Sequence, residues 1–140
     1  MENRALIRLA LEARERAYVP YSKYQVGAAL LAKDGTVYQG CNIENAAYTP
    51  TNCAERTAFF KAVSEGVRDF EAIAIVGGYA GAPVDYAYPC GVCRQVMMEF
   101  CDPKSFRVIT AISEEIYLER TLEEMLPHGF GPSKLKGDSD

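Results

Sequence analysis

Residues 2–18 alternate apolar and charged side chains with the period of an amphipathic helix. Five apolar residues recur every three or four positions: Leu6, Leu9, Ala10, Ala13 and Ala17. This spacing predicts a helix over residues 2–18 with one apolar face. Pro20 is expected to end it, because proline has no backbone N–H and clashes with the preceding turn.

Further along the chain, apolar runs of strand length are separated by turn residues. They predict strands at residues 26–33, 36–43, 71–78, 106–112 and 115–121. The first two are joined by Asp34-Gly35, a dipeptide typical of a two-residue hairpin turn. The run EAIAIVGG at 71–78 is almost wholly apolar, as expected of a strand buried on both faces of a sheet.

Helix signals lie between and after these strands. Thr51 or Asn52 is expected to cap a helix that runs to about Glu65, and Gly66 is expected to stop it. Two shorter helices are predicted at residues 91–100 and 121–127.

The order of these elements alternates helices with single strands or strand pairs. It predicts an α/β fold, a three-layer αβα sandwich with helices on both faces of a mixed five-stranded sheet. The chain of 140 residues has the usual length of one domain. We therefore expect a single domain over residues 1–140, in which residues 131–140 form a loosely ordered tail.

Composition and charge narrow the classes of function. Hydrophobic residues make up 49% of the chain and charged residues 24%, as in ordinary globular proteins. A net charge of -4 disfavours a nucleic-acid partner, because polyanion binding depends on clustered Lys and Arg. No apolar run reaches the roughly 18 residues of a membrane span, and the N-terminus lacks the apolar core of a signal peptide. The expectation is a cytoplasmic protein without a membrane partner.

Five cysteines, an odd number, argue against a disulfide framework and favour a metal site or catalysis. Cys90 and Cys93 form a C-x-x-C pair, and Cys53 stands at the start of the other predicted helix. Helix N-termini stabilise thiolates through their free N–H groups and the helix dipole. Three thiolates leave a tetrahedral zinc ion one open position, the arrangement of a catalytic site. The expected cofactor is one Zn²⁺ per chain.

Alternatives stay open for these cysteines. A C-x-x-C pair alone also occurs in redox-active sites and in structural zinc knuckles. A structural zinc site needs a fourth ligand, for which the candidates are His128, Cys41 and Cys101. None of them has zinc-ligand spacing to the others. We expect His128 to lie in a loop, and the two cysteines to be small buried apolar groups.

Two charged residues follow Cys53 closely. Glu55 can lie beside the metal without binding it, and can take a proton from metal-bound water and pass it to a substrate. Three thiolates around Zn²⁺ leave a net charge of about -1. Arg56 is expected to offset this charge by donating to the thiolates, with Arg94 as a second candidate. The alternative for Arg56 is a plain surface charge.

These motifs resemble those of the zinc nucleobase deaminases, in which Cys-x-Glu or His-x-Glu precedes Pro-Cys-x-x-Cys. The matching stretches are CAE at 53–55 and PCGVC at 89–93. Four longer segments resemble the small homotetrameric cytidine deaminases, in the family's order: residues 18–48, 53–66, 89–100 and 122–130. The resemblance covers nearly the whole chain and implies the cytidine deaminase-like fold. It also implies that Cys53, Cys90 and Cys93 are the zinc ligands and that Glu55 is the proton shuttle.

The resemblance also implies substrate-binding residues. Asn42 and Glu44 match residues that hydrogen-bond the ribose hydroxyls, and the backbone of Ala54 matches the group that faces the polar edge of the pyrimidine. Phe130 matches an aromatic residue that stacks on the base from a neighbouring subunit. It implies a homotetramer with active sites shared between subunits. Tyr24 departs from the family's usual Phe, and its hydroxyl either touches the ribose or reaches solvent.

The resulting hypothesis is hydrolytic deamination of cytidine and 2′-deoxycytidine to the uridines, with release of ammonia, in pyrimidine salvage. Hydroxide on the zinc attacks C4 while Glu55 shuttles protons. The expected partner is therefore a small nucleoside, and Asn42 and Glu44 favour it over a free base. The alternatives are an aminated nucleoside antibiotic as substrate and a non-enzymatic zinc module with four protein ligands. The unusual stretches TPTN before Cys53 and YAY before Pro89 flank the pocket and bear on substrate range.

Overall fold

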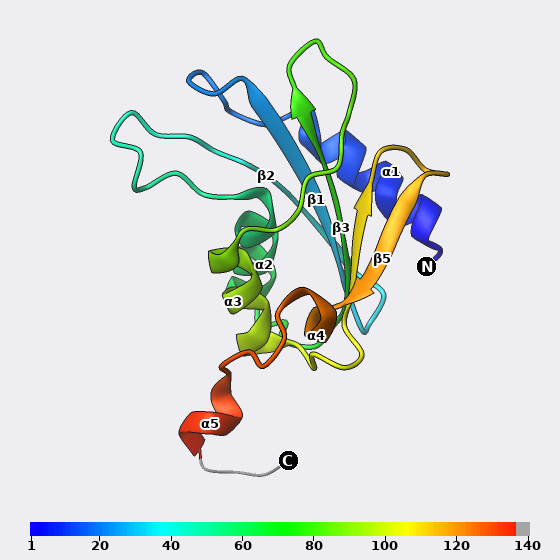
Figure 1. Ribbon diagram of the computed structural model, residues 1–140, viewed down its shortest axis with the longest axis vertical. Helices are drawn as coiled ribbons and strands as arrows, with labels where there is room; N and C mark the ends of the chain where they lie inside the picture. Colours follow the sequence, from blue (N-terminus) through cyan, green and yellow to red (C-terminus); the bar gives the residue numbers. More distant parts are fainter. Residues whose placement is uncertain (137–140) are drawn as a thin grey trace.

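Residues 1–136 are described by the computed structural model, in which five strands form one sheet (Figure 1). The strands are β1 (Tyr24–Ala32), β2 (Val37–Cys41), β3 (Phe70–Tyr79), β4 (Arg107–Ala111) and β5 (Tyr117–Thr121). Their order across the sheet is β2-β1-β3-β4-β5. Only β3 and β4 are parallel neighbours among these strands, so the sheet is mixed, as predicted.

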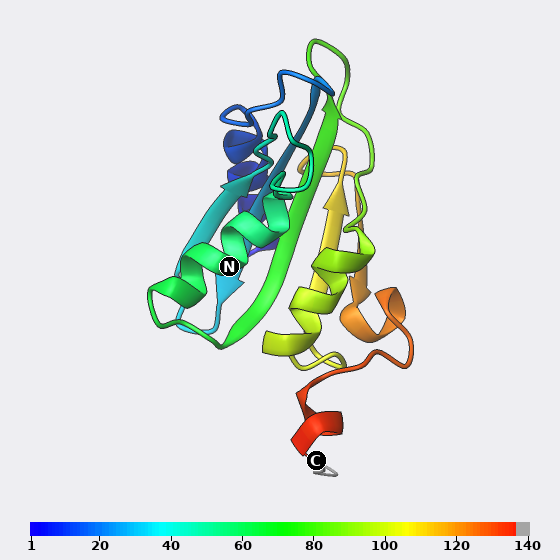
Figure 2. The same cartoon turned by 90° about the vertical axis from the view of Figure 1, so that its left-hand side faces the viewer.

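Helices cover both faces of this sheet (Figures 1 and 2). On one face lies α1 (Asn3–Arg14), and on the other lie α2 (Ala54–Ser64) and α3 (Gly91–Phe100). Two short helices, α4 (Leu122–Met125) and α5 (Pro132–Lys136), follow β5. The predicted three-layer αβα sandwich is confirmed.

Strand β1 is buried on both faces because successive side chains of a strand point to opposite sides. Ala28 and Leu30 face the layer of α2 and α3, whereas Ala29 and Leu31 face α1. Strand β3 divides its side chains between the same two clusters. The continuous apolar run at 71–78 is thus explained by a central strand with helices on either side.

Two glycines let helices lie directly on the β1–β2 hairpin. A Cβ atom at Gly40 would be 2.4 Å from the carbonyl oxygen of Ala54 and 2.6 Å from the amide nitrogen of Ala58. A Cβ atom at Gly27 would be 2.1 Å from the carbonyl oxygen of Ala10. Non-bonded heavy atoms do not approach so closely, so α1 and α2 each pack backbone to backbone against the sheet.

The helix predicted over residues 2–18 is wrong at its C-terminal end, since α1 ends at Arg14. Tyr18 instead pairs with the chain that follows β2. Its N–H donates to the carbonyl of Asn42 at 3.0 Å, and its carbonyl accepts from the N–H of Glu44 at 2.9 Å. This tertiary pairing outweighs the helical periodicity of the last residues of the segment.

The predicted cap of the second helix is also wrong. Helix α2 begins at Ala54 with Cys53 as its N-cap. Asn52 is not available as a cap because it pairs with Ile43 through two backbone hydrogen bonds of 2.9 and 3.0 Å. The stop is as predicted, with Gly66 in the left-handed region at a φ of 93°.

The remaining expectations concern the C-terminal part and single residues. Residues 132–136 form α5 where the sequence suggested a loose tail, and residues 137–140 lie outside the described part of the chain. His128 lies in a loop, Cys101 is buried and Cys41 is half-buried. Within residues 1–136 there is no helix that is both long enough and apolar enough to cross a membrane.

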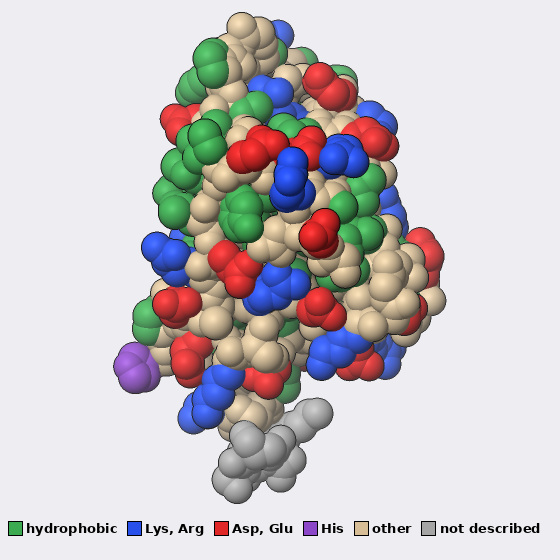
Figure 3. Space-filling model, turned by 90° about the vertical axis from the view of Figure 1, so that its right-hand side faces the viewer, with side chains coloured by type: hydrophobic (Ala, Val, Ile, Leu, Met, Phe, Trp, Pro, Cys, Tyr) green, Lys and Arg blue, Asp and Glu red, His purple; other side chains and the backbone are tan. Residues whose placement is uncertain are grey.

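Acidic and basic side chains are mixed on the face that carries α1 and β5 (Figure 3). Arg8 pairs with Glu114 at 2.9 Å, and Arg4 pairs with Glu115 at 3.2 Å. These pairs link α1 to the loop between β4 and β5. Exposed ion pairs of this kind contribute little to stability, because water and salt screen both charges.

Candidate active site

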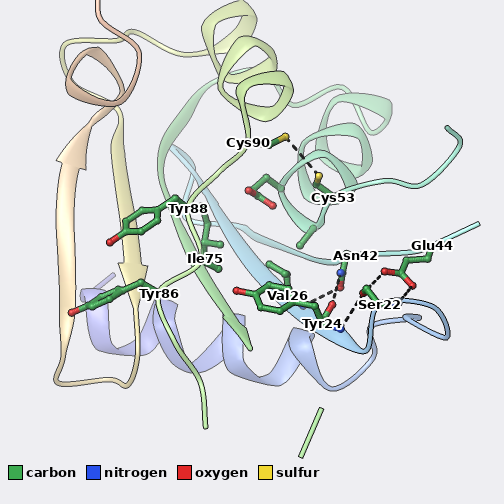
Figure 4. A pocket seen from close by; sticks show the side chains of 13 residues that line it. Ser22, Tyr24, Val26, Asn42, Glu44, Cys53, Ile75, Tyr86, Tyr88 and Cys90 are labelled. Atoms are coloured by element: carbon green, nitrogen blue, oxygen red, sulfur yellow. Dashed lines mark hydrogen bonds between the residues drawn. The ribbon is translucent and has the colours of Figure 1, made fainter. Parts of the chain in front are cut away.

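Three cysteine sulfurs meet where the N-termini of α2 and α3 come together. Cys53 is the N-cap of α2, Cys90 is the N-cap of α3, and Cys93 lies in the first turn of α3. The sulfur of Cys90 lies 3.8 Å from that of Cys53 and 3.5 Å from that of Cys93. Figure 4 shows the Cys53 and Cys90 side chains pointing toward each other.

These separations fit a tetrahedral zinc ion. Zinc–sulfur bonds are about 2.3 Å long, which places two sulfurs of a tetrahedron about 3.8 Å apart. Within the described residues, the cluster of metal-ligating groups comprises these three cysteines, whose sulfurs all lie within 4.8 Å of one another. His128, Cys41 and Cys101 are not part of it. The donor set is therefore the three-ligand type, which leaves one position for a substrate or water.

The sulfurs of Cys53 and Cys93 compete for one proton. Hydrogen bonding from Cys93, and then from Arg56, lowers the pKa of the Cys53 thiol to about 5. The same hydrogen bond raises the pKa of Cys93, because two neighbouring sulfurs share one proton more easily than they carry two negative charges. A divalent cation among the sulfurs would take the place of that shared proton.

Of the two arginines that the sequence suggested, one lies at the sulfurs. The Nη2 atom of Arg56 lies 3.4 Å from the sulfur of Cys53, and its Nε is buried without a hydrogen-bond partner among the described residues. Arg94 instead donates to the backbone carbonyls of Pro89 at 2.7 Å and Met125 at 2.6 Å. Arg94 thus fixes the start of α3 against the C-terminal end of α4 and does not compensate the sulfur charge.

Glu55 is the buried carboxyl group of the site. Only 4% of the residue is exposed, and this burial is the main reason why the pKa of Glu55 rises to about 7. The neighbouring charge of Cys53 raises it further, and Arg56 lowers it. A carboxyl group with such a pKa gains and releases a proton near neutral pH, as a proton shuttle must.

A cavity of about 400 Å³ opens beside the sulfurs. Its wall includes most of the side chains that the sequence singled out: Tyr24, Asn42, Glu44, Cys53, Ala54, Glu55 and Cys90. The volume lies within the range of sites for small organic ligands. The structure thus brings together a metal donor set, a proton-transferring carboxyl group and polar side chains around one ligand-sized space.

Comparisons with known proteins agree with this arrangement. The family model of the cytidine and deoxycytidylate deaminase zinc-binding region matches residues 1–109, a stretch that contains all three cysteines. The chain belongs to this family. Zinc is therefore its metal, and the cluster of three cysteines is the group in the described residues that fits zinc.

Relatives resemble the chain over nearly its whole length. The cytidine deaminase of Sporosarcina psychrophila is 55% identical over 135 residues, which cover 96% of both chains. That of Halalkalibacterium halodurans is 55% identical over 130 residues, which cover 93% of this chain and 95% of the relative. The crystal structure of the cytidine deaminase from Burkholderia pseudomallei superposes with a TM-score of 0.84 at 45% identity, covering 93% and 100% of the two chains.

The polar side chains of Asn42 and Glu44 in the cavity wall are tied to the backbone. The amide of Asn42 accepts from the N–H of Val26 at 2.9 Å and donates to the carbonyl of Tyr24 at 2.8 Å. Glu44 accepts from the N–H groups of Tyr21 and Ser22 and from the Ser22 hydroxyl. These bonds fix both side chains before any ligand binds.

Tyr24 places its ring along the cavity wall. The ring packs edge to face against Tyr79 at a centroid distance of 5.0 Å. Its hydroxyl points away from Asn42 and Glu44 (Figure 4) and lies against Gly77, where an added Cβ would be 3.2 Å away. Burial raises the pKa of Tyr24, and the charge of Asp85 raises it further.

Phe130 does not line the cavity of its own chain. It is 54% exposed, and its carbonyl accepts a hydrogen bond from the Gln95 side chain at 2.8 Å. If Phe130 completes a substrate site, that site must therefore be the cavity of a second chain.

The cavity wall also includes Ser22, Val26, Ile75, Tyr86, Ala87 and Tyr88. The stretch YAY at 86–88 lies in this wall as expected, and the signal for it was its position immediately before the PCGVC motif. Sequence reasoning missed Ser22, Val26 and Ile75. Ser22 had no such signal, since its position in the cavity depends on a turn that lies far from the cysteines in sequence.

Proposed function

We propose that the chain hydrolyses the exocyclic amine of cytidine and 2′-deoxycytidine, giving uridine and 2′-deoxyuridine with release of ammonia. The observation that carries this proposal is the placement of Glu55. Its buried carboxyl group lies in a ligand-sized cavity beside three sulfurs whose spacing fits zinc. That combination matches what hydrolytic removal of an amine from a pyrimidine requires.

Zinc held by Cys53, Cys90 and Cys93 supplies a Lewis acid that makes water a nucleophile near neutral pH. Glu55 takes a proton from the water whose oxygen adds to C4 of the pyrimidine, and donates this proton to N3. It then takes the second water proton from the hydroxyl now on C4 and gives it to the amine. The C4–N bond breaks, the C4 carbonyl forms, and the amine leaves as ammonia. Each proton thus passes through a carboxyl group whose pKa of about 7 suits transfer in both directions.

The remaining residues hold the substrate and adjust charge. The backbone of Ala54 lines the cavity and is suited to the polar edge of the base. Asn42 and Glu44 bind the sugar hydroxyls from the other end of the cavity. Arg56 offsets the negative charge of the sulfurs through its contact with Cys53.

The assembly that we propose is a homotetramer with shared active sites, in a cytoplasmic pyrimidine-salvage enzyme. It is supported by the exposed Phe130 ring, which lies outside the cavity of its own chain. Sedimentation analysis gives the subunit number. Removing the ring by Phe130→Ala should raise KM for cytidine without changing zinc content if the ring stacks on a base in a neighbouring subunit.

Turnover of cytidine, followed by ultraviolet absorbance with zinc counted per chain, tests the activity. Glu55→Gln keeps the shape of the side chain but removes its proton chemistry, so kcat should fall by roughly 10² to 10⁴ with zinc retained. Glu99→Gln, the same change at an exposed residue of α3, is the matched control and should leave kcat unchanged. Normal turnover by Glu55→Gln would show that Glu55 is not the proton shuttle.

The same assay separates the alternatives. Turnover of cytosine or blasticidin S in preference to cytidine would move the proposal to a free base or an aminated nucleoside antibiotic. Full zinc content without turnover of any of the three compounds would favour a non-enzymatic zinc module.

A further inference from the structure

Ser22 is a polar residue of the cavity wall that the mechanism above leaves without a role. It lies directly against Glu44 (Figure 4). One carboxylate oxygen of Glu44 accepts from the N–H of Tyr21 at 3.0 Å and from the N–H of Ser22 at 3.1 Å. The other oxygen accepts from the Ser22 hydroxyl. The turn at residues 21–22 therefore holds both oxygens of Glu44.

The direction of the Ser22 hydroxyl is also fixed. Its oxygen accepts from the N–H of Tyr24 at 3.0 Å, so the hydroxyl proton is directed to Glu44. A carboxylate has about four lone-pair positions. Since the turn uses three of them, roughly one acceptor position of Glu44 remains for a ligand in the cavity.

The backbone around Ser22 is held in place from several sides. Lys23 has a φ of 62°, a left-handed conformation that is unfavourable for a lysine. It persists because its N–H donates to the carbonyl of Val19 at 3.1 Å and its carbonyl accepts from the N–H of Ala80 at 2.7 Å. Unfavourable backbone conformations that the surroundings maintain in this way are concentrated at functional sites.

We propose that Ser22 is a positioning residue, which orients the Glu44 carboxylate so that its free acceptor position meets a sugar hydroxyl of the substrate. This inference rests on the proposed function, and it adds a residue to which neither the sequence motifs nor the mechanism assigned a role. Ser22 acts through Glu44 and does not take part in the chemistry at C4. Its removal should therefore weaken recognition of the sugar while the proton transfers of Glu55 continue.

Ser22→Ala tests the proposal with two substrates, cytidine and 2′,3′-dideoxycytidine. Loss of a hydrogen bond to a charged group should raise KM for cytidine by roughly tenfold, with kcat nearly unchanged. The KM for 2′,3′-dideoxycytidine should stay the same, because that substrate lacks the hydroxyls that Glu44 would bind. Ser22→Thr keeps the hydroxyl at an exposed position and should restore the KM for cytidine.

A double-mutant cycle separates positioning from a general effect on the turn. If Ser22 acts through Glu44, then Ser22→Ala should change KM little in a protein that already carries Glu44→Gln. Lys23→Gly is the matched control in the same turn, because glycine adopts the left-handed conformation freely. It should leave both KM values unchanged. If Ser22→Ala unfolds the protein, the double variant Ser22→Ala/Lys23→Gly replaces it, because glycine at position 23 removes the backbone strain of the turn. The same two KM values are then measured.

The proposal is overturned if Ser22→Ala leaves the KM for cytidine unchanged. It is also overturned if the two substrates are affected equally, or if the effects of Ser22→Ala and Glu44→Gln simply add. Failure of the proposed function looks different, because the unmodified zinc-containing protein would then turn over no cytidine. That result would overturn both proposals before any variant is compared.

Discussion

Replacing Gly40 by alanine should damage the zinc site from a position outside the cavity. The added Cβ would lie 2.4 Å from the carbonyl oxygen of Ala54 and 2.6 Å from the amide nitrogen of Ala58, both in α2. Favourable contacts between non-bonded carbon-type atoms begin near about 3.5 Å. Helix α2 must therefore retreat from β2 by about 1 Å at its first turns.

That movement matters because the start of α2 carries both Cys53 and Glu55. Metal–ligand distances in a working site hold to within about 0.2 Å, so a displacement of about 1 Å moves Cys53 out of reach of an ion held by Cys90 and Cys93. We expect zinc content well below one per chain and a loss of kcat of about 10²-fold or more. Overpacking itself should lower the free energy of unfolding by about 1–3 kcal/mol.

The assay combines zinc content per folded chain, thermal unfolding and turnover of cytidine. Gly27→Ala is the matched control, since its Cβ would lie 2.1 Å from the carbonyl oxygen of Ala10 in α1, on the opposite face of the sheet. It should lower stability at least as much, yet leave the zinc content of the folded fraction near one. If Gly40→Ala kept full zinc content and normal kcat, the close packing of α2 would not be what positions Cys53.

Three further predictions concern other parts of the molecule. Asn42→Ala removes the side-chain bonds to Val26 and Tyr24 and should lower the free energy of unfolding by about 1–3 kcal/mol in urea titrations; an unchanged midpoint would contradict this. Burial raises the pKa of the Cys101 thiol, so mass spectrometry should show alkylation of Cys101 by iodoacetamide at pH 8 only after unfolding. Hydrogen bonding and charge from Arg8 hold the pKa of Glu114 below its usual range. The stability from this pair is therefore present above the ordinary glutamate pKa and is lost as the pH falls below it, so Glu114→Gln should flatten the acid limb of a plot of urea midpoint against pH.

Short-range sequence patterns were sufficient to predict most of the helices and strands and part of the candidate site. The Asp34-Gly35 pair predicts a two-residue hairpin turn; a hairpin forms there, but the N–H of Ala32 donates to the carbonyl of Thr36, so residues 33–35 make a three-residue turn with Gly35 at a φ of 93°. The C-x-x-C spacing places Cys90 and Cys93 in one helical turn, with sulfurs 3.5 Å apart. Both outcomes depend on residues within four positions of one another, so backbone geometry alone decides them.

Sequence periodicity failed where a distant segment competed for the backbone. The apolar spacing that continues to Ala17 predicted a longer first helix, but Tyr18 bonds to the backbone of Asn42 and Glu44 instead. Asn52 resembles a helix cap, but its backbone pairs with Ile43. In both cases the deciding partner lies outside the window over which propensity and periodicity operate.

The sequence by itself therefore determined the helices and strands of the αβα fold, the three candidate zinc ligands and the carboxylate of Glu55. Each of these follows from a pattern of residues that lie close together in the sequence. Only the tertiary structure decided that Cys53 comes within 3.8 Å of Cys90. It also buried Glu55 and placed Ser22 against Glu44. The physical reason is that these relations depend on how α2 and α3 pack on one face of a shared sheet, and on glycines that set the distance between helix and strand.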